Sequence, residues 1–511
     1  MLRYNRPLAR TIKKLLIANR GEIAMRVLRA ARELGISSVA VYSDADRRAL
    51  HVLHADEAYR LGPAPASESY LRGDLILEIA KQCGADAIHP GYGFLSENAN
   101  FAESCEQAGI IFVGPSASAM RQLGSKTSAR QLADAAGVPR VPGTTAAAAS
   151  AEEALAAARN IGFPVMLKAA AGGGGKGMRA VESESELRSA LAAAQSEAQR
   201  AFGSSDVYLE KLIVRPRHIE IQVLGDQHGN VVYLGERECS VQRRHQKVIE
   251  EAPSAVVAES LRRRMGETAV ALAKHAGYSN AGTAEFLVDA DNNFYFLEMN
   301  TRLQVEHPVT ELVTGLDLVH LQLQIAAGDP LPFTQEQVQL RGHAIECRIY
   351  AEDPDNNFFP SPGTIDGLSR PSGPGLREDC GIYDGWTVPL DYDPMLSKLI
   401  AYAPTRALAI ARMRHALDDY FIGGIATNIS LFKRILSDPD FQSARIDTSY
   451  LDRLLATDKP EPHRAAEISR DEKMTAIAAV IFSNGAAPTP LTSAAGAESA
   501  WKQAGRREGL S

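Results

Sequence analysis

The chain has 511 residues, of which 45% are hydrophobic and 23% are charged, and its formal net charge at pH 7 is -7. This length predicts about three domains of roughly 150 residues each, with enough core to fold without disulfides or structural metals. The acidic balance argues against a protein that coats nucleic acid, and no apolar run approaches the ~18 residues that a membrane-spanning helix requires.

The cysteines are few and scattered, which excludes a disulfide framework. There are five of them, and no two form a CxxC pair. This usage is typical of a reducing compartment, so we expect a cytoplasmic protein. The segment 1–14 is basic, contains no acid and lacks the continuous apolar core of a secretory signal, so we interpret it as a frayed leader, with a transit peptide as the alternative.

The first 125 residues alternate apolar strands with helices. The helix after the first strand has apolar positions from Ile23 to Leu34 and ends at Gly35, and the strands are expected at 15–18, 38–42, 87–88 and 110–113. This alternation predicts a parallel α/β sheet. Because Asn19-Arg20-Gly21-Glu22 stands where a GxGxxG motif would be, we expect a Rossmann-like fold without a dinucleotide site.

A glycine-rich loop, 172–177, lies in a second region that runs from 126 to 213. We expect strands at 164–169 and 178–181 on either side of it, with helices at 151–159 and 184–200. The strand that follows the loop argues against a Rossmann loop, and Gly177 after Lys176 breaks the Walker A pattern. Glycine backbones can point successive N–H groups at phosphate oxygens, so the pattern favours a phosphate-binding flap over a surface linker.

Two carboxylates are expected to face each other across a hairpin formed by 283–288 and 294–299. If Asp291-Asn292 is the centre of the turn, Glu285 pairs with Glu298, and Asn300 lies on the same face. Two acids and an amide on one face between apolar neighbours indicate a site for Mg²⁺ or Mn²⁺. A solvated sheet face with incidental acids is the alternative, and a one-residue slip of register would separate the pair.

The segment 300–307 is expected to continue this strand, so that Arg302, Gln304 and Glu306 share a face. A guanidinium suits a carboxylate-like anion, and Glu306 could act as a general base toward it. The run 242–247 is a second basic cluster, which is either a solvated face or an anion site.

Five segments together resemble biotin carboxylase, the ATP-grasp component of biotin-dependent carboxylases, over about 15–455. They are 19–24, 89–98, the glycine loop, 242–247 and 298–307. The resemblance implies an α/β ATP-grasp fold with a Rossmann-like (preATP-grasp) domain at 12–125, an ATP-grasp domain at 126–330 with a glycine-rich lid at about 141–213, and a C-terminal biotin carboxylase domain at 341–455. The remainder, 458–511, is rich in Ala, Gly, Pro and charge and is expected to be a disordered tail.

The resemblance also implies roles for individual residues. The expected ATP-binding set is Lys126, Lys168, Gly172, Gly173, Gly174, Gly175, Lys176, Gly177, Glu210, Lys211, Ile213, His218, Gln242 and His245. The expected ligands of Mg²⁺ or Mn²⁺, with two ion sites, are Glu285, Glu298 and Asn300. The expected bicarbonate site is Lys247, Arg302, Gln304, Val305 and the base Glu306, and Arg348 is expected to stabilise the biotin enolate.

The activity implied is carboxylation of biotin by ATP and bicarbonate through carboxyphosphate. Because the tail looks too short and biased for a biotin-bearing domain, we expect biotin on a separate carrier protein, with carboxyltransferase partners and a homodimer. The complex would be an acetyl-CoA carboxylase of fatty acid biosynthesis or a propionyl-CoA carboxylase. The alternatives are another ATP-grasp ligase with a different acceptor, or a silent nucleotide-binding regulatory subunit.

Overall fold

The computed structural model describes residues 12–124, 126–144, 147–148, 150–169, 178–202 and 204–457. The glycine loop 172–177, the tail 458–511 and most of the basic leader lie outside these ranges, and so does the side chain of Lys126. The residues up to Leu454 form one unit.

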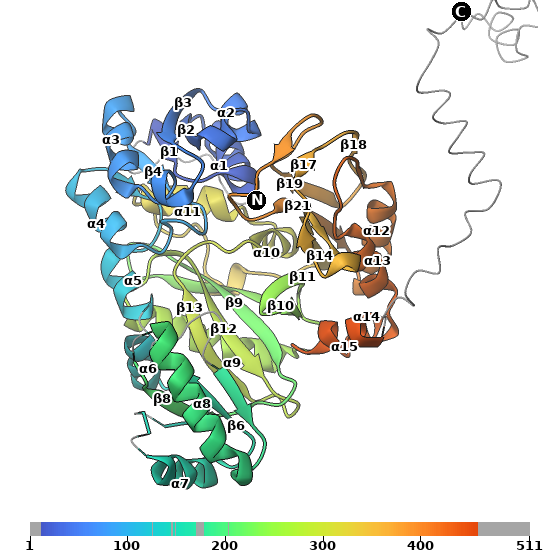
Figure 1. Cartoon of the computed structure of the whole chain (residues 1–511). Coiled ribbons are helices and arrows are strands. Elements are labelled where there is room, and N and C mark those ends of the chain that lie inside the picture. The colour runs from blue at the N-terminus through green and yellow to red at the C-terminus, as the bar shows by residue number, and fades with distance from the viewer. Residues whose placement is uncertain are drawn as a thin grey trace, which may run out of the picture. The chain divides into compact units, whose positions relative to one another are not determined.

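The N-terminal region is a five-stranded parallel sheet in the order β3-β2-β1-β4-β5, drawn in blue in Figure 1. This confirms the α/β prediction. Its strands are β1 (Lys14–Ile17), β2 (Ser37–Ser43), β3 (Glu57–Gly62), β4 (Ala87–His89) and β5 (Ile111–Phe112), and its helices are α1 (Gly21–Glu33), α2 (Leu50–His54), α3 (Gly73–Cys83), α4 (Ala99–Gln107) and α5 (Ala117–Gly124). Alternating apolar residues of the strands pack into cores on both faces of the sheet.

The region around the glycine loop is a small antiparallel sheet in the order β7-β6-β8. Its elements are β6 (Val165–Ala169), β7 (Met178–Val181), β8 (Val207–Lys211), α6 (Lys126–Ala135), α7 (Ala151–Ile161) and α8 (Glu184–Phe202). The side chains of α7, α8 and the three strands share one apolar core. The expected order of strand, glycine loop and strand is therefore confirmed at both ends of the loop.

An eight-stranded sheet forms the centre of the molecule, and its order is β13-β12-β9-β10-β11-β14-β21-β19. The strands are β9 (Arg217–Gly225), β10 (Val231–Arg243), β11 (Gln246–Ala252), β12 (Asn280–Val288), β13 (Phe294–Asn300), β14 (His343–Tyr350), β19 (Leu376–Cys380) and β21 (Met395–Ala403). All neighbouring strands are antiparallel. The sheet thus continues from the 126–330 segment into the 341–455 segment.

Several helices pack against this sheet. Among them, helix α9 (Glu259–His275) covers β9 and β10, α10 (His307–Thr314) lies against β14, β10, β11 and β21, and α11 (Leu318–Ala326) contacts β12 and α1. Figure 1 shows α10 next to β14 and β21. Glu306 is the residue that precedes this helix.

The C-terminal region adds helices and two-stranded ribbons around β14, β19 and β21. These are β15 (Glu352–Asp353), β16 (Phe359–Pro360), β17 (Gly363–Thr364), β18 (Leu368–Ser369), β20 (Thr387–Val388), β22 (Phe421–Ile422), α12 (Arg406–Asp419), α13 (Ile429–Ser437), α14 (Pro439–Gln442) and α15 (Tyr450–Thr457). After β19 the backbone passes very close to the start of α1. A Cβ at Gly381 would lie 2.8 Å from the backbone nitrogen of Glu22.

The cysteines and the helices agree with the compositional analysis. All five cysteines are free and buried. Among the helices of the described ranges, none is long and apolar enough to cross a membrane.

Candidate active site

A cavity of about 1630 Å³ lies where β6, β8, β13, α1 and β14 converge. Every predicted site residue whose side chain is described contributes to its lining. These residues are Lys168, Glu210, Lys211, Ile213, His218, Gln242, His245, Lys247, Glu285, Glu298, Asn300, Arg302, Gln304, Val305, Glu306 and Arg348. The chain therefore gathers into one cavity residues that are up to 180 positions apart in the sequence.

The two carboxylates of the hairpin face each other, as predicted, although the turn is not the predicted one. Glu285 of β12 is the partner of Glu298 in β13, but Val288 pairs with Phe294, one residue out of the register that a turn centred on Asp291-Asn292 would give. The turn is longer, since the Asp289 N–H donates to the Asn293 carbonyl. An irregularity in the ladder just after Glu285 then shifts the pairing by one residue and restores the Glu285–Glu298 pair.

The physical reason for the longer turn is the side chain of Asp289. Its carboxylate accepts hydrogen bonds from the backbone N–H groups of Asp291 and Asn293, both at 2.9 Å, and from the Asn293 side chain at 3.0 Å. Asn292 takes the left-handed conformation, with φ of 62°, which asparagine tolerates better than most residues. Local side-chain hydrogen bonds therefore determine the turn.

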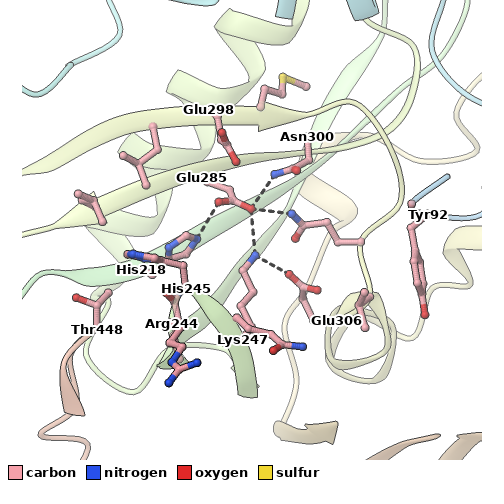
Figure 2. Close-up of a pocket in the computed structure, with 18 of the residues that line it drawn as sticks. Tyr92, His218, Arg244, His245, Lys247, Glu285, Glu298, Asn300, Glu306 and Thr448 are labelled. Atoms are coloured by element: carbon pink, nitrogen blue, oxygen red, sulfur yellow. Dashed lines mark hydrogen bonds and ion pairs between the residues drawn. The ribbon is translucent and has the colours of Figure 1, made fainter. Parts of the chain in front are cut away.

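Glu285 is the centre of a dense polar cluster (Figure 2). Its Oε1 accepts hydrogen bonds from Asn300 Nδ2 at 2.7 Å, from Gln304 Nε2 at 2.8 Å and from Lys247 Nζ at 3.0 Å. Its Oε2 lies 3.0 Å from His218 Nε2. Burial opposes ionisation, but Lys247 and His218 outweigh it and hold the pKa of Glu285 well below its usual range.

The donor set fits a hard divalent cation. Figure 2 shows the side chains of Glu285, Glu298 and Asn300 directed to the same side of the hairpin, and each can offer an oxygen atom. Glu285 and Asn300 are buried, whereas Glu298 is exposed to the cavity side. Carboxylate and amide oxygens are the ligands that Mg²⁺ prefers, and a partly open set leaves room for phosphate oxygens and water.

A second carboxylate, Glu306, is held between two cations. Lys247 Nζ lies 2.9 Å from its Oε1, and Arg348 Nη2 lies 2.8 Å from its Oε2. Burial alone would raise the pKa of Glu306, but Lys247 and Arg348 outweigh burial and hold this pKa below its usual range. Glu306 is therefore ionised throughout the neutral range, which is the state that a general base requires.

The segment 301–306 is not the strand that we expected. Strand β13 ends at Asn300, and Glu306 is the residue that precedes helix α10. The alternation is interrupted for two reasons. Pro308 lies in the first turn of the helix, which begins at His307, and Glu97 accepts hydrogen bonds from the Thr301 N–H at 2.9 Å and from Arg302 Nε at 3.0 Å. Gln304 and Glu306 nevertheless reach the same cluster through the turn.

Three of the predicted nucleotide-binding residues, Lys168, Glu210 and Lys211, lie on β6 and β8 and line the cavity there. Lys168 on β6 forms an ion pair with Glu210 on β8, and Lys211 Nζ donates to the carbonyls of Gly162 and Phe163 at 2.9 and 2.8 Å. The run 242–247 forms a tight turn between β10 and β11. Arg244 and His245 both have positive φ there, so that Gln242 and Lys247 pair across the turn.

The structure also contains charged residues that the sequence analysis missed. Arg237 is fully buried and donates to Glu220 at 3.2 Å and to Gln304 Oε1 at 3.0 Å, and Arg348 pairs with Glu250 at 2.5 Å. Glu220 also contacts Lys247 and His218. A period-two pattern of polar residues inside strands, at 218, 220 and 222 and again at 346 and 348, could have indicated that such residues share one face of the sheet.

Comparison with known proteins gives three matching family models. They are the biotin carboxylase N-terminal domain at residues 11–120, the ATP-binding domain of the carbamoyl-phosphate synthase L chain at 125–334, and the biotin carboxylase C-terminal domain at 346–453. A biotin carboxylase of Halalkalibacterium halodurans is 55% identical over 439 residues, which cover 86% of this chain and 97% of that protein. The propionyl-CoA carboxylase alpha chain of Ruegeria pomeroyi is 51% identical, over 86% of this chain and 67% of that protein.

A solved structure is also very similar. It is the biotin carboxylase domain dimer of Hydrogenobacter thermophilus 2-oxoglutarate carboxylase in complex with MgADP, ADP and bicarbonate. The TM-score is 0.81 at 48% identity, and the match covers 86% of this chain and 97% of that one.

Proposed function

Because this chain belongs to the biotin carboxylase family of ATP-grasp ligases, we propose that it carboxylates biotin on a separate biotin carboxyl carrier protein, using ATP and bicarbonate. The observation that carries this proposal is the cluster of Lys247, Glu306 and Arg348 beside Glu285 and Asn300. A base between two cations, next to a set of oxygen ligands, suits the attack of a small anion on a phosphate bound with its metal.

Bicarbonate would bind to Lys247, Arg302, Gln304, the backbone of Val305 and Glu306. An anion that takes Lys247 as its partner weakens the contact between Lys247 and Glu306, which is 2.9 Å long in this structure. Since that contact holds the pKa of Glu306 low, its loss makes the carboxylate a stronger base at the moment when bicarbonate arrives. Glu306 then takes the bicarbonate proton, and the resulting oxyanion attacks the γ-phosphate, which breaks its bond to the β-phosphate, releases ADP and forms carboxyphosphate.

The nucleotide would lie against Lys168, Glu210, Lys211, Ile213, His218, Gln242 and His245, together with Lys126 and the glycine loop 172–177. Glu285, Glu298 and Asn300 would hold one or two Mg²⁺ or Mn²⁺ ions, which neutralise charge on the phosphates. Arg237 fixes the oxygen of Gln304 at 3.0 Å, so the Gln304 amide N–H groups face Glu285 and the anion site.

Carboxyphosphate would decay to CO₂ and phosphate, and the phosphate would take the biotin proton. Arg348 would stabilise the resulting biotin enolate, whose ureido nitrogen would attack CO₂ to give carboxybiotin. In this structure Arg348 is buried and contacts Glu306 and Glu250. The charge of Arg348 therefore lies beside Glu306, the base that starts the reaction. The activation of bicarbonate and the carboxylation of biotin would thus share one electrostatic site.

We propose that the reaction is the first half of an acetyl-CoA or propionyl-CoA carboxylase, with carboxyltransferase partners, and that the chain acts as a homodimer. The Halalkalibacterium relative supports a separate carrier, because the match covers 97% of its length and leaves no room there for a further domain. The dimer in the Hydrogenobacter structure supports the homodimer. Co-purification of the partner subunits, followed by an assay with each acyl-CoA, identifies the substrate.

The test is bicarbonate-dependent ATP cleavage by the purified chain with Mg²⁺, and its stimulation by free biotin. Glu306→Gln should lower kcat by about 10²–10⁴-fold while nucleotide affinity stays within about twofold of wild type, because Glu306 is the base and does not bind the nucleotide. Glu336→Gln, a change in the first turn of a surface helix outside the lining of the cavity, is the matched control and should leave both quantities unchanged.

Two outcomes would contradict the proposal. ATP cleavage that ignores both bicarbonate and biotin would favour a ligase with another acceptor. Tight ATP binding without any turnover would favour a regulatory subunit.

A further inference from the structure

Lys398 is a lysine with no solvent-exposed surface in the middle of strand β21. Its ammonium donates to the carbonyl oxygen of Val305 at 2.8 Å and lies 3.3 Å from Glu22 Oε1 and 3.8 Å from Asp379 Oδ2. It also lies 5.8 Å from the ring centre of Tyr92. One side chain therefore contacts α1, β19 and the turn before α10, which belong to three separate regions of the sequence.

The carbonyl that Lys398 holds belongs to the peptide that joins Val305 to Glu306. Because a peptide group is planar, fixing its oxygen also fixes the direction of the Glu306 backbone nitrogen and so the start of the Glu306 side chain. The rest of the turn is anchored elsewhere: Glu97 accepts from the Thr301 N–H, and the His307 ring lies 2.8 Å from the Gln304 carbonyl. Lys398 supplies the anchor nearest to the base.

Glu22 depends on Lys398 more than Asp379 and Glu311 do. Asp379 is bound by Arg377 at 2.9 and 2.8 Å, and Glu311 is bound by both Arg377 and Arg26. Within the described residues, both oxygens of Glu22 are buried without a hydrogen bond. An unpaired buried carboxylate is costly, so the pair of Glu22 and Lys398 is stable only with the ammonium in its present position.

We propose that Lys398 is a positioning residue for the bicarbonate site, which holds the Val305–Glu306 peptide in place, with Glu22 as the counter-ion that keeps its ammonium there. This inference rests on the proposed function, because it assigns a role toward the base Glu306. Neither Lys398 nor Glu22 touches bicarbonate. Lys398 acts through Val305 and Glu22 acts through Lys398.

The first test is Lys398→Met, with the KM values for bicarbonate and ATP measured separately. We expect the KM for bicarbonate to rise about tenfold or more and kcat to fall, because small displacements of a catalytic group cost one to two orders of magnitude. The KM for ATP should stay within about twofold of wild type.

Arg406→Met is the matched control. Arg406 is also a largely buried cation of the C-terminal region, paired with Glu251 at 2.7 Å and bound to the Phe441 carbonyl at 2.9 Å, but it does not contact the turn 301–306. It should lower the Tm and leave both KM values unchanged. A folded Lys398→Met protein with wild-type KM for bicarbonate, or with equal rises in both KM values, would overturn the inference.

Glu22→Gln provides a second test, which keeps the lysine. Burial raises the pKa of Glu22 to about 7, against the opposing effect of Lys398, and the other charged groups that act on it are Asp379 and Arg377 on β19. Wild-type Glu22 is therefore ionised at pH 8 and largely protonated at pH 6. The difference in kcat/KM for bicarbonate between wild type and Glu22→Gln should be large at pH 8 and shrink toward pH 6, with bicarbonate corrected for CO₂ at each pH.

A difference that stays constant with pH would reject the role of Glu22, even if Lys398→Met does not fold. Failure of the proposed function would be recognised separately, because wild-type protein would then show no bicarbonate dependence at all.

Discussion

The carboxylates of this site differ from one another mainly in their partners. Glu285 and Glu306 each contact Lys247 and a further donor or cation, whereas Glu346 on β14 is buried with no hydrogen bond to either oxygen among the described residues. Burial, and the nearby Glu250 opposite it in the ladder, raise the pKa of Glu346 well above its usual range, against the attraction of Lys398. The same residue type is thus kept ionised at one position and made harder to ionise at another.

This contrast gives a prediction for stability against pH. A group whose pKa is raised on folding binds its proton more tightly in the native state, so its contribution is present below its unfolded pKa and is lost as pH rises above it. Glu346→Gln removes this titration. We expect the Tm of the variant to exceed that of wild type by a few degrees at pH 9 and by less at pH 5, as measured by thermal unfolding. A Tm difference independent of pH would contradict the assignment.

At the scale of the element, sequence patterns predicted strands and helices well where one period dominated. The parallel N-terminal sheet, the strands on both sides of the glycine loop and the Glu285–Glu298 pair were all expected and are all present. The errors were at the turn after Val288 and at the segment 301–306. Both depend on hydrogen bonds from single side chains, Asp289 and Glu97, and the second comes from a residue about 200 positions away, which no local pattern reveals.

The site was predicted only in part, because some of its contacts also come from residues that are distant in the sequence. Residues next to recognisable motifs lie in the cavity, whereas Arg237, Glu250 and Lys398 were missed. Lys398 is a lone charge inside an apolar strand, whereas Arg237 and Glu250 each stand next to another charged residue in their strands. The partners of all three come from other strands or helices, so their roles depend on the order of the strands in the sheet, which the sequence alone does not display.

The hairpin turn offers a direct test of that local control. Asp289→Ala removes an acceptor of two backbone hydrogen bonds and should lower the free energy of unfolding by about 1–2 kcal/mol. Asn292→Gly, at the left-handed position of the same turn, should change it by less than about 0.5 kcal/mol, because glycine adopts this conformation without strain. Urea unfolding of both variants measures the difference, and equal losses would show that Asp289 does not determine the turn.

At the scale of the whole molecule, buried ion pairs join regions that are distant in sequence. Arg26 on α1 binds Glu311 of α10 at 2.9 Å and Asp317 at 2.7 Å, and Arg377 of β19 binds Glu311 at 2.7 Å. Burial alone would raise the pKa of Glu311, but Arg26 and Arg377 outweigh burial and hold this pKa below its usual range. A group of this kind stabilises the native state above its unfolded pKa, and that contribution is lost as the pH falls below it.

Arg26→Met should therefore destabilise the protein at pH 7 by about 3 kcal/mol, because it leaves a buried carboxylate with one partner fewer. The loss should shrink as the pH falls from about 4.5 toward 3, where wild type loses the same interaction. Denaturant unfolding of both proteins across this range checks the expectation. A destabilisation that is the same at pH 3 and pH 7 would rule out the ion pair as its cause.

The close approach at Gly381 has a consequence for which substitutions this chain can accept. The space that a side chain would need there is already occupied by the backbone of Gly21 and Glu22. A single added methyl group would push the first turn of α1 outward and carry Glu22 away from Lys398. A mutation that removes no charge and no hydrogen-bonding group could thus weaken the anchor of Val305, and a search for damaging variants confined to polar residues would overlook it.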